Sequence, residues 1–355
     1  MINSTNLTNL NSSLRAFGAV PSDISVRWID IGLSSPELFH ASYVGLAHAQ
    51  ARDAEPVILW GRATAHVCLG ASQSAADELE PEIAFPVCRR PLGGGTVWLD
   101  ETQYCFIYIV PQAHLCSAPR TWGEWALAPA LGTYHDFDLL VRRVDQDIWL
   151  HQQKIGGSGS ATVNQCAVIA GSFMMHFAAD SFVSCVRASC PGFRKRLASA
   201  LKEGMTDWAS HQTPPNEQDL KQVFQHNILR ELGWYCRDGN FFPHELAAIE
   251  AAVLELREDD AEDVVRPKVR RVKINAHTYL CERYFGKQWL RVLTDRDRIS
   301  SLEASLNLSP QIVCGLYDVP VEKAHLRAYL SQYLHQESAS CWAERIYDTV
   351  RVSHG

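Results

Sequence analysis

The sequence predicts an α/β (α+β) fold in which a mixed, mostly antiparallel sheet is flanked by helices and followed by a small C-terminal α+β domain. Short apolar or β-branched runs, broken by Gly and polar residues, recur between residues 57 and 177 and are typical of strands. Apolar residues at helical spacing predict amphipathic helices before and after that region. The acidic stretch 258–263 and the basic cluster that follows it indicate a domain boundary near residue 260.

Helix start and stop signals support the helical segments. Pro36 suits the first turn of the first helix, whereas Pro129 must kink or end the second. Asn216 and Gly233 are typical of the cap and the stop of another helix. The expected helices span 35–51, 121–134, 193–202, 217–232, 244–257 and 321–334.

The strands are expected to be short, with one exception. The run 104–110 is nearly all apolar, so it should be a central strand that is covered on both faces. The expected strands span 57–60, 65–69, 87–89, 96–98, 104–110, 139–144, 148–150, 153–163 and 166–177. The chain would then divide into a flexible tail (1–24), a large domain (25–258), a small accessory domain (262–335) and a second tail (336–355).

Composition excludes several classes of protein. With 46% hydrophobic and 21% charged residues and a net charge of −7, the chain is typical of globular proteins and lacks the basic balance of a nucleic-acid binder. No run approaches the ~20 apolar residues of a membrane span, and the N-terminal region does not have the pattern of a secretory signal. The 11 cysteines form no CxxC pair, so we expect a cytoplasmic protein without a disulfide framework. Neither HExxH nor a paired Cys/His spacing indicates a histidine metal site.

The segment 89–98, RRPLGGGTVW, is the most informative part of the chain. Glycine lets the backbone approach a ligand closely, and arginine offers a planar fork of donors to a carboxylate or phosphate. Arg90 with Gly93, Gly94 and Gly95 therefore suits an anionic or adenylated ligand. A tight hairpin explains these residues equally well. The pattern is neither a P-loop nor a GxGxxG fingerprint.

Two further segments carry polar groups near glycines. Lys154 precedes the stretch GGSGS and could place a compact positive charge on a phosphate or carbonyl oxygen. Asp147 could hold Mg²⁺ or a ribose hydroxyl. Taken alone, these residues favour an exposed hairpin lysine beside a flexible loop. The third segment, 169–175, is by itself an apolar strand that contains a glycine.

In this order the three segments resemble the lipoate–protein ligase family of the biotin/lipoate A/B protein ligase superfamily. The segment 68–73 is similar to the family's strand end before the arginine pair, and 204–208 is similar to a short segment after its catalytic sheet. The resemblance covers 26–210 well, and the helices up to about 257 fit in order. The stretch 265–335 loosely resembles the family's accessory domain. This implies a biotin/lipoate ligase-type catalytic domain over 25–258.

The resemblance also implies a reaction. An ATP-dependent ligase would activate lipoate, or a related medium-chain acid, as acyl-AMP and transfer it to a lysine of a lipoyl-carrier protein domain. ATP, Mg²⁺ and lipoate are the expected ligands. Lys154 would be catalytic, Asp147 would hold the metal or the nucleotide, and Arg90 would converge with Lys154 on one apolar slot. The expected binding residues are Arg90, Gly93, Gly94, Gly95, Asp147, Gly157, Ser158, Gly159, Gly171 and Ser172.

Five positions depart from the family pattern and remove or move polar groups in the expected pocket. Such changes predict altered specificity for the acid or the nucleotide, or weaker catalysis. They are Leu92 for Ser, Leu99 for His, Gln103 for Asn, Gln146 for Asn and Ala170 for His.

Two alternatives stay open at this point. An octanoyl/lipoyl transferase would use a cysteine thioester and no ATP, and Cys190, followed by Pro191 and Gly192, lies roughly where one subgroup has its nucleophile. The lost polar positions instead suggest a non-catalytic lipoyl-binding protein. A biotin ligase is disfavoured, because its basic glycine-rich loop and Trp-Pro-Asn-Asp stretch are both missing.

Overall fold

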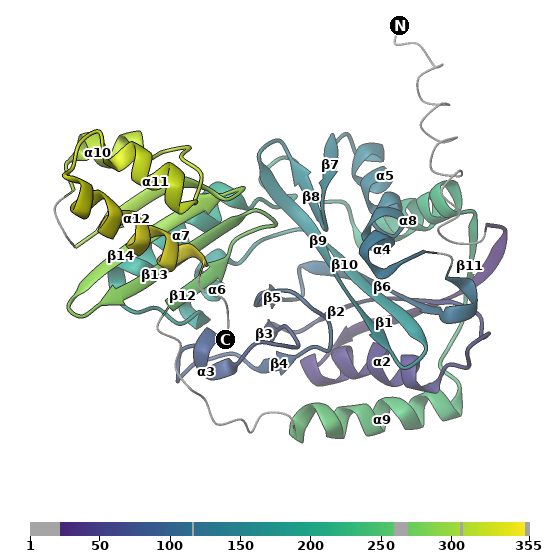
Figure 1. Ribbon diagram of the computed structural model, residues 1–355. Helices are drawn as coiled ribbons and strands as arrows, with labels where there is room; N and C mark the ends of the chain where they lie inside the picture. The colour runs from purple at the N-terminus through teal and green to yellow at the C-terminus, as the bar shows by residue number, and fades with distance from the viewer. Residues whose placement is uncertain (1–21, 116, 259–268, 306–307, 352–355) are drawn as a thin grey trace, which may run out of the picture. The chain divides into compact units, whose positions relative to one another are not determined.

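The chain folds into two compact units, each with its own sheet (Figure 1). The computed structural model describes residues 22–115, 117–258, 269–305 and 308–351. The first unit contains Met1–Ser74, Ile83–Ala178 and Thr206–Glu262, and the C-terminal unit contains Ala75–Glu82, Ala179–Met205 and Asp263–Gly355. Two segments of the range expected for the large domain, 75–82 and 179–205, thus belong to the C-terminal unit.

The first unit is built on an eight-stranded sheet in the order β11-β1-β2-β6-β10-β9-β8-β7. β1 pairs in parallel with β11 and β2, and every other pair in this sheet is antiparallel, which confirms the mixed, mostly antiparallel sheet. The strands are β1 (Ile24–Ser34), β2 (Val57–Ala63), β6 (Gln103–Pro111), β7 (Val141–Val144), β8 (Asp147–Leu150), β9 (Gln153–Val163), β10 (Cys166–Met174) and β11 (Trp234–Asp238). The apolar run 104–110 lies within β6, which is central and buried as expected.

Two of these strands were not expected from the sequence. β1 begins at Ile24, inside the range expected to be a flexible tail, while residues 1–21 of that tail lie outside the described residues. β11 follows Gly233, whose left-handed conformation ends the preceding helix and turns the chain into the sheet edge beside β1. Both strands depend on pairing between distant parts of the chain, so local pattern predicts them poorly.

Helices cover both faces of this sheet (Figure 1). On one face α2 (Pro36–Ala49) packs against α9 (Pro243–Glu258), where a Cβ on Gly45 would lie 2.5 Å from Ile249 Cα. Only glycine permits so close a crossing. The other face holds α4 (Trp122–Ala126), α5 (Ala128–Asp136) and α8 (Glu217–Leu232), preceded by the short turns η1 (Gln112–His114) and η2 (Pro119–Thr121). A cluster of stacked and tilted aromatic rings fills this side, including Trp28, Trp60, Phe106, Tyr134, Phe173 and Phe224.

The expected helix over 121–134 consists of two helices. α4 ends at Ala126 and α5 begins at Ala128, so that Pro129 lies in the first turn of α5. The backbone N–H groups of a first turn have no partner within the helix, and proline therefore costs little there.

A three-stranded sheet in the order β4-β3-β5 presents the glycine-rich segment. It contains β3 (His66–Leu69), β4 (Val87–Arg89) and β5 (Val97–Leu99). β3 pairs in parallel with β4 and antiparallel with β5. The connection between β4 and β5 holds Arg90 and the three consecutive glycines.

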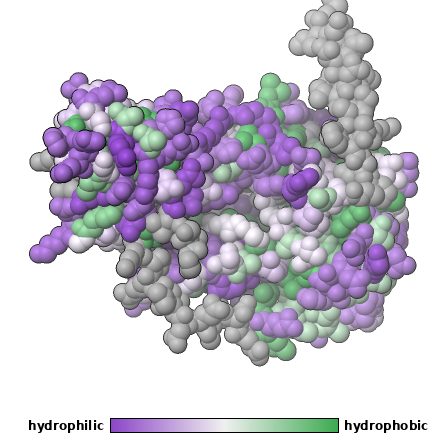
Figure 2. Space-filling model, viewed as in Figure 1, coloured by the Kyte–Doolittle hydropathy of each residue, from purple (hydrophilic) through white to green (hydrophobic). Residues whose placement is uncertain are grey.

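The C-terminal unit has a four-stranded antiparallel sheet and helices, which confirms a small α+β domain. The strands are β12 (Val269–Lys273), β13 (Thr278–Phe285), β14 (Gln288–Asp295) and β15 (Arg298–Ala304). The helices are α3 (Ala75–Glu78), α6 (Ala179–Cys185), α7 (Pro191–Gly204), α10 (Pro310–Gly315), α11 (Lys323–Leu330) and α12 (Gln336–Arg351). Hydrophilic residues dominate the face of this unit that Figure 2 shows.

The expectation of a tail over 336–355 is wrong for 336–351. α12 occupies this range and contacts β13, β14 and α11. Its buried residues recur three or four positions apart, which is the spacing of one helix face (Ala339, Ala343, Ile346 and Val350). Much of the rest of α12 is polar, so the apolar stripe is a weak signal in the sequence. Among the described residues, no helix is long and apolar enough to cross a membrane.

Candidate active site

Arg90 braces the glycine-rich loop rather than pointing freely toward solvent. Its Nη1 donates to the carbonyl oxygen of Cys68 at 3.0 Å, and its Nη2 donates to the carbonyl oxygens of Gly93 at 3.2 Å and Gly95 at 2.7 Å. The residue is only 8% exposed. The planar fork of a guanidinium can hold several carbonyls at once. Arg90 therefore sets the shape of the loop.

The glycines are required where the loop meets its neighbours. A Cβ on Gly70 would lie 2.1 Å from the carbonyl oxygen of Gly94, and Gly94 itself has a φ of +105°. Side chains are excluded from both positions, by contact at the first and by backbone conformation at the second. The loop also reaches β9, because Gly93 N donates to Ser160 O at 3.5 Å.

Lys154 and Asp147 form an ion pair across the β8–β9 hairpin. Lys154 Nζ lies 2.8 Å from Asp147 Oδ1, and the two side chains are 21% and 6% exposed. Gly157 lies opposite Asp147 in the sheet register. A Cβ on Gly157 would be 2.8 Å from Asp147 Oδ1 and 2.9 Å from Lys154 Nζ. Glycine at this position makes room for the pair.

The lysine pair and the glycine-rich loop lie on the same face of β9. Alternate residues of a strand face the same side, so Gly157 and Gly159 point to one face about 7 Å apart. The Lys154–Asp147 pair occupies the space above Gly157, and Gly93 O would be 3.4 Å from a Cβ on Gly159. The ammonium group and the Arg90-braced loop are thus neighbours along one strand.

The remaining expected site residues lie on β9 and β10 but do not all face the loop. Ser158 alternates with Gly157 and Gly159, so it points to the opposite face of the sheet together with its register partner Gly171. Gly171 pairs with Ser158, and a Cβ on Gly171 would lie 2.5 Å from the Phe106 ring, so this glycine makes room for the aromatic core. Ser158 donates its Oγ to the side-chain oxygen of Gln146 at 3.2 Å. Ser172 pairs with Cys105 of β6.

Four of the five departures from the family pattern have structural explanations. Leu92 Cβ would lie 3.7 Å from a Cβ on Gly159, and Ala170 is the register partner of Gly159, so both make that part of the surface apolar. Gln103 donates to Trp98 O at 3.0 Å. Gln146, besides contacting Ser158, packs where Gly123 of α4 lacks a side chain. Nothing in the structure explains Leu99.

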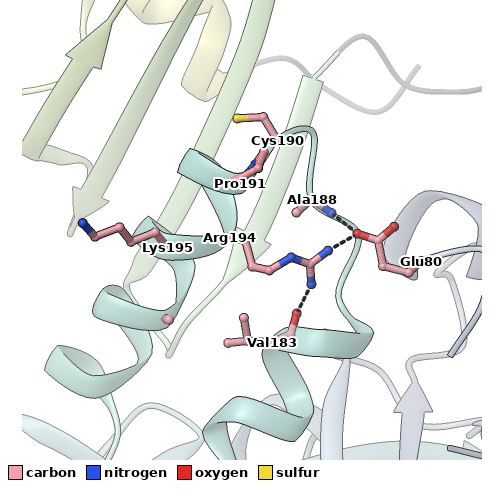
Figure 3. A pocket seen from close by; sticks show the side chains of 8 residues that line it. Glu80, Val183, Ala188, Cys190, Pro191, Arg194 and Lys195 are labelled. Atoms are coloured by element: carbon pink, nitrogen blue, oxygen red, sulfur yellow. Dashed lines mark hydrogen bonds and ion pairs between the residues drawn. The ribbon is translucent and has the colours of Figure 1, made fainter. Parts of the chain in front are cut away.

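Cys190 belongs to the C-terminal unit, whereas Lys154 belongs to the first. The half-buried Cys190 caps α7 and accepts hydrogen bonds on Sγ from Phe193 N and Arg291 Nη2, both at 3.4 Å. It borders a cavity of about 700 Å³ in that unit, where Arg194 is paired with Glu80 (Figure 3).

A buried cluster beside Arg90 was missed by the sequence analysis. Arg90 Nη1 lies 3.3 Å from Cys68 Sγ, and His66 and Cys68 are alternate residues of β3. Burial opposes ionisation of the Cys68 thiol, but Arg90 and His66 outweigh it, so the pKa of Cys68 lies below its usual value. Burial lowers the pKa of the nearby His40 to about 3, so this imidazole stays neutral. The His-x-Cys spacing on a strand was the available signal.

The eight-stranded sheet and the loop that rests on β9 form the fold that solved lipoate–protein ligases share. The chain belongs to the lipoyl protein ligase A/B catalytic domain family, whose model matches residues 40–229. This confirms the resemblance seen in the sequence. No curated protein sequence matched the chain.

Solved structures share the fold at low sequence identity. A bipartite lipoate protein ligase from Thermoplasma acidophilum, described with its E2 lipoyl domain, is similar with a TM-score of 0.61 and 14% identity over 68% of this chain and 99% of that one. Lipoate-protein ligase A bound with ATP gives 0.55 and 14%, covering 65% and 95%. The P. falciparum protein LipL1 in complex with lipoate gives 0.51 and 11%, covering 91% and 100%.

Proposed function

We propose that this protein is an ATP-dependent ligase that activates lipoate, or a related medium-chain acid, and attaches it to a lysine of a lipoyl-carrier domain. Family membership and relatives of the same fold described with ATP, with lipoate and with a lipoyl domain support the proposal. The observation that carries it is the Lys154 ammonium, held by Asp147 on the same face of β9 as the triple-glycine loop.

The proposed chemistry has two steps. A carboxylate oxygen of the acid attacks the α-phosphorus of ATP, a new C(O)O–P bond forms, and pyrophosphate leaves. The carrier lysine amine then attacks the acyl carbonyl, loses its proton and expels AMP. Lys154 would offset the negative charge that develops on the phosphate and carbonyl oxygens. Glycine backbone beside it would let the substrate lie close to the sheet.

Asp147 is the residue that would hold Mg²⁺, which neutralises charge on the phosphates when it is bound. A single carboxylate such as Asp147 suits this role, because Mg²⁺ in nucleotide enzymes is commonly held by one or two carboxylates together with substrate phosphates. Asp147 is largely buried and also contacts Lys154. Its second role is therefore to orient the ammonium group toward the reacting oxygens.

The direct test is to incubate the full chain with ATP, Mg²⁺ and lipoate or octanoate, following pyrophosphate release, and then with a lipoyl domain analysed by mass spectrometry. Lys154→Ala should reduce the rate of pyrophosphate release by about 10²–10³, the usual effect of removing one group that stabilises transition-state charge. Lys273→Ala, an exposed lysine of β12, should leave the rate unchanged.

Either of two results would contradict the ligase proposal. One is an acceptor that stays unmodified with every short and medium acid, and the other is pyrophosphate release that does not exceed the release by Lys154→Ala. Binding of a lipoyl domain without pyrophosphate release would favour the non-catalytic lipoyl-binding protein, which the apolar positions Leu92 and Ala170 motivate.

A transferase is the second candidate, motivated by the half-buried Cys190 with two hydrogen-bond donors on its sulfur. A transferase would form a thioester at Cys190 from an octanoyl-loaded carrier and would need no ATP. Cys190→Ala should abolish acyl exchange between carriers if this is correct. A ligase should retain its ATP-dependent activity in the same variant.

A further inference from the structure

Three metal-ligand side chains meet behind the glycine-rich loop, within the first unit. They are His40 of α2 and His66 and Cys68 of β3, and their donor atoms all lie within 4.8 Å of one another. Their exposures are 1%, 0% and 0%. Buried polar groups need hydrogen-bond or metal partners to offset the loss of water.

The Nδ1 atoms of both histidines already have hydrogen-bond partners. His66 Nδ1 donates to Thr64 O at 2.7 Å, which leaves the lone pair of the neutral ring on Nε2. His40 Nδ1 lies 2.9 Å from the Tyr43 hydroxyl, and its Nε2 lies 3.0 Å from His66 Nε2. Metal-binding histidines usually hold their second nitrogen to a carbonyl or hydroxyl in this way, which orients the ligating nitrogen.

We propose that His40 Nε2, His66 Nε2 and the Cys68 thiolate form a site for a borderline transition metal, with Zn²⁺ as the best fit. The mixed nitrogen and sulfur donors suit Zn²⁺ rather than Mg²⁺ or Ca²⁺. Tetrahedral Zn²⁺ bonds imply separations of about 3.3 Å between two nitrogens and about 3.6 Å between nitrogen and sulfur. The observed Nε2–Nε2 distance of 3.0 Å needs to open by only a few tenths of an ångström.

Each proton of the site can be accounted for before and after metal binding. Without metal, Tyr43 donates to His40 Nδ1, and His40 Nε2 donates to the lone pair of His66. Binding moves the His40 proton to Nδ1, where the Tyr43 oxygen accepts it, and any proton on Cys68 leaves to solvent. The three protein donors leave one coordination position for a solvent molecule.

The site would have a consequence for the loop. Arg90 donates to Cys68 Sγ at 3.3 Å, a hydrogen bond that a metal-bound thiolate accepts. The same guanidinium holds the carbonyls of Gly93 and Gly95. A metal at Cys68 would thus tie α2, β3 and the glycine-rich loop together, independently of any catalytic role.

The test uses the purified full chain after treatment with a chelator. Titration with Co²⁺ should give the visible bands of four-coordinate cobalt and a near-ultraviolet thiolate charge-transfer band, both displaced by Zn²⁺. Metal analysis after dialysis against Zn²⁺ should show stoichiometric zinc. Zn²⁺ should also raise the unfolding temperature.

Cys68→Ser should lose the charge-transfer band, and Cys166→Ser, a buried cysteine of β10, should keep it. If Cys68→Ser does not fold, the Co²⁺ titration is carried out on His66→Gln, and the cobalt spectrum should be weaker than that of the wild type. A wild-type chain that takes up no Co²⁺ or Zn²⁺ overturns the proposal and leaves a hydrogen-bonded histidine pair. A charge-transfer band that persists in Cys68→Ser also overturns it.

Discussion

Replacing Arg90 with lysine tests whether Arg90 holds the glycine-rich loop in shape or binds substrate. The guanidinium holds the carbonyls of Cys68, Gly93 and Gly95 at 3.0, 3.2 and 2.7 Å. A lysine ammonium is a compact charge on a flexible stem, so we expect it to keep one of these three bonds. A hydrogen bond to a charged group contributes about 1.5–3 kcal/mol. The loss of two bonds would lower the free energy of unfolding by about 3–6 kcal/mol. Because Gly93 is exposed, water can replace its bond, and the loss should lie near the lower value.

We therefore expect Arg90→Lys to lower the free energy of unfolding of the first unit by about 3 kcal/mol. Urea titration followed by tryptophan fluorescence would measure it, since Trp98 is buried in β5 next to the loop. Arg89→Lys is the matched control, because Arg89 is half-buried and its guanidinium donates to the carbonyl of Gln73, a bond that a lysine ammonium can keep. Its effect should stay below about 1 kcal/mol. The reasoning is refuted if Arg90→Lys unfolds like the wild type and only the KM for the acid rises.

Two further predictions concern stability. Arg27→Leu removes the cationic partner of the buried Glu245 carboxylate and should lower the free energy of unfolding in urea by about 3–5 kcal/mol. Arg237→Leu, which breaks an exposed pair, should lower it by less than about 1 kcal/mol, and equal effects of the two variants would contradict this. Truncation after residue 335 removes α12 together with Ile346 and Val350, whose burial contributes about 1.5–3 kcal/mol each, and uncovers the apolar residues of the same cluster, such as Leu326 and Leu330. Limited proteolysis should then digest the C-terminal unit first, and protection equal to that of the full chain would show that α12 is dispensable.

Local sequence signals predicted the elements whose stability is itself local. The helix Glu217–Leu232 has the expected limits, because Asn216 accepts the hydrogen bond of Asp219 N at its start and Gly233 adopts the left-handed conformation at its end. The apolar run within β6 predicted a central strand, since only a strand covered on both faces tolerates such a sequence. These features need no knowledge of distant residues.

Elements defined by distant partners escaped prediction. β1 pairs with β11, more than two hundred residues away, and the segments 75–82 and 179–205 join a unit whose sheet begins at Val269. α12 has few large apolar residues and becomes recognisable only when the sheet and α11 cover its stripe. In each case the stabilising contact lies outside any local window.

For the candidate site, the sequence by itself determined which residue types were present and in which order. Glycines in series, an arginine before them and a lysine after an aspartate predicted a family, and the family model agrees. Only the tertiary structure decided what each group does. It placed Lys154 beside Asp147, turned Arg90 toward backbone carbonyls, and brought His40 of a helix to His66 and Cys68 of a strand. Sheet pairing and helix packing fix those distances, and the positions of residues along the chain do not encode them.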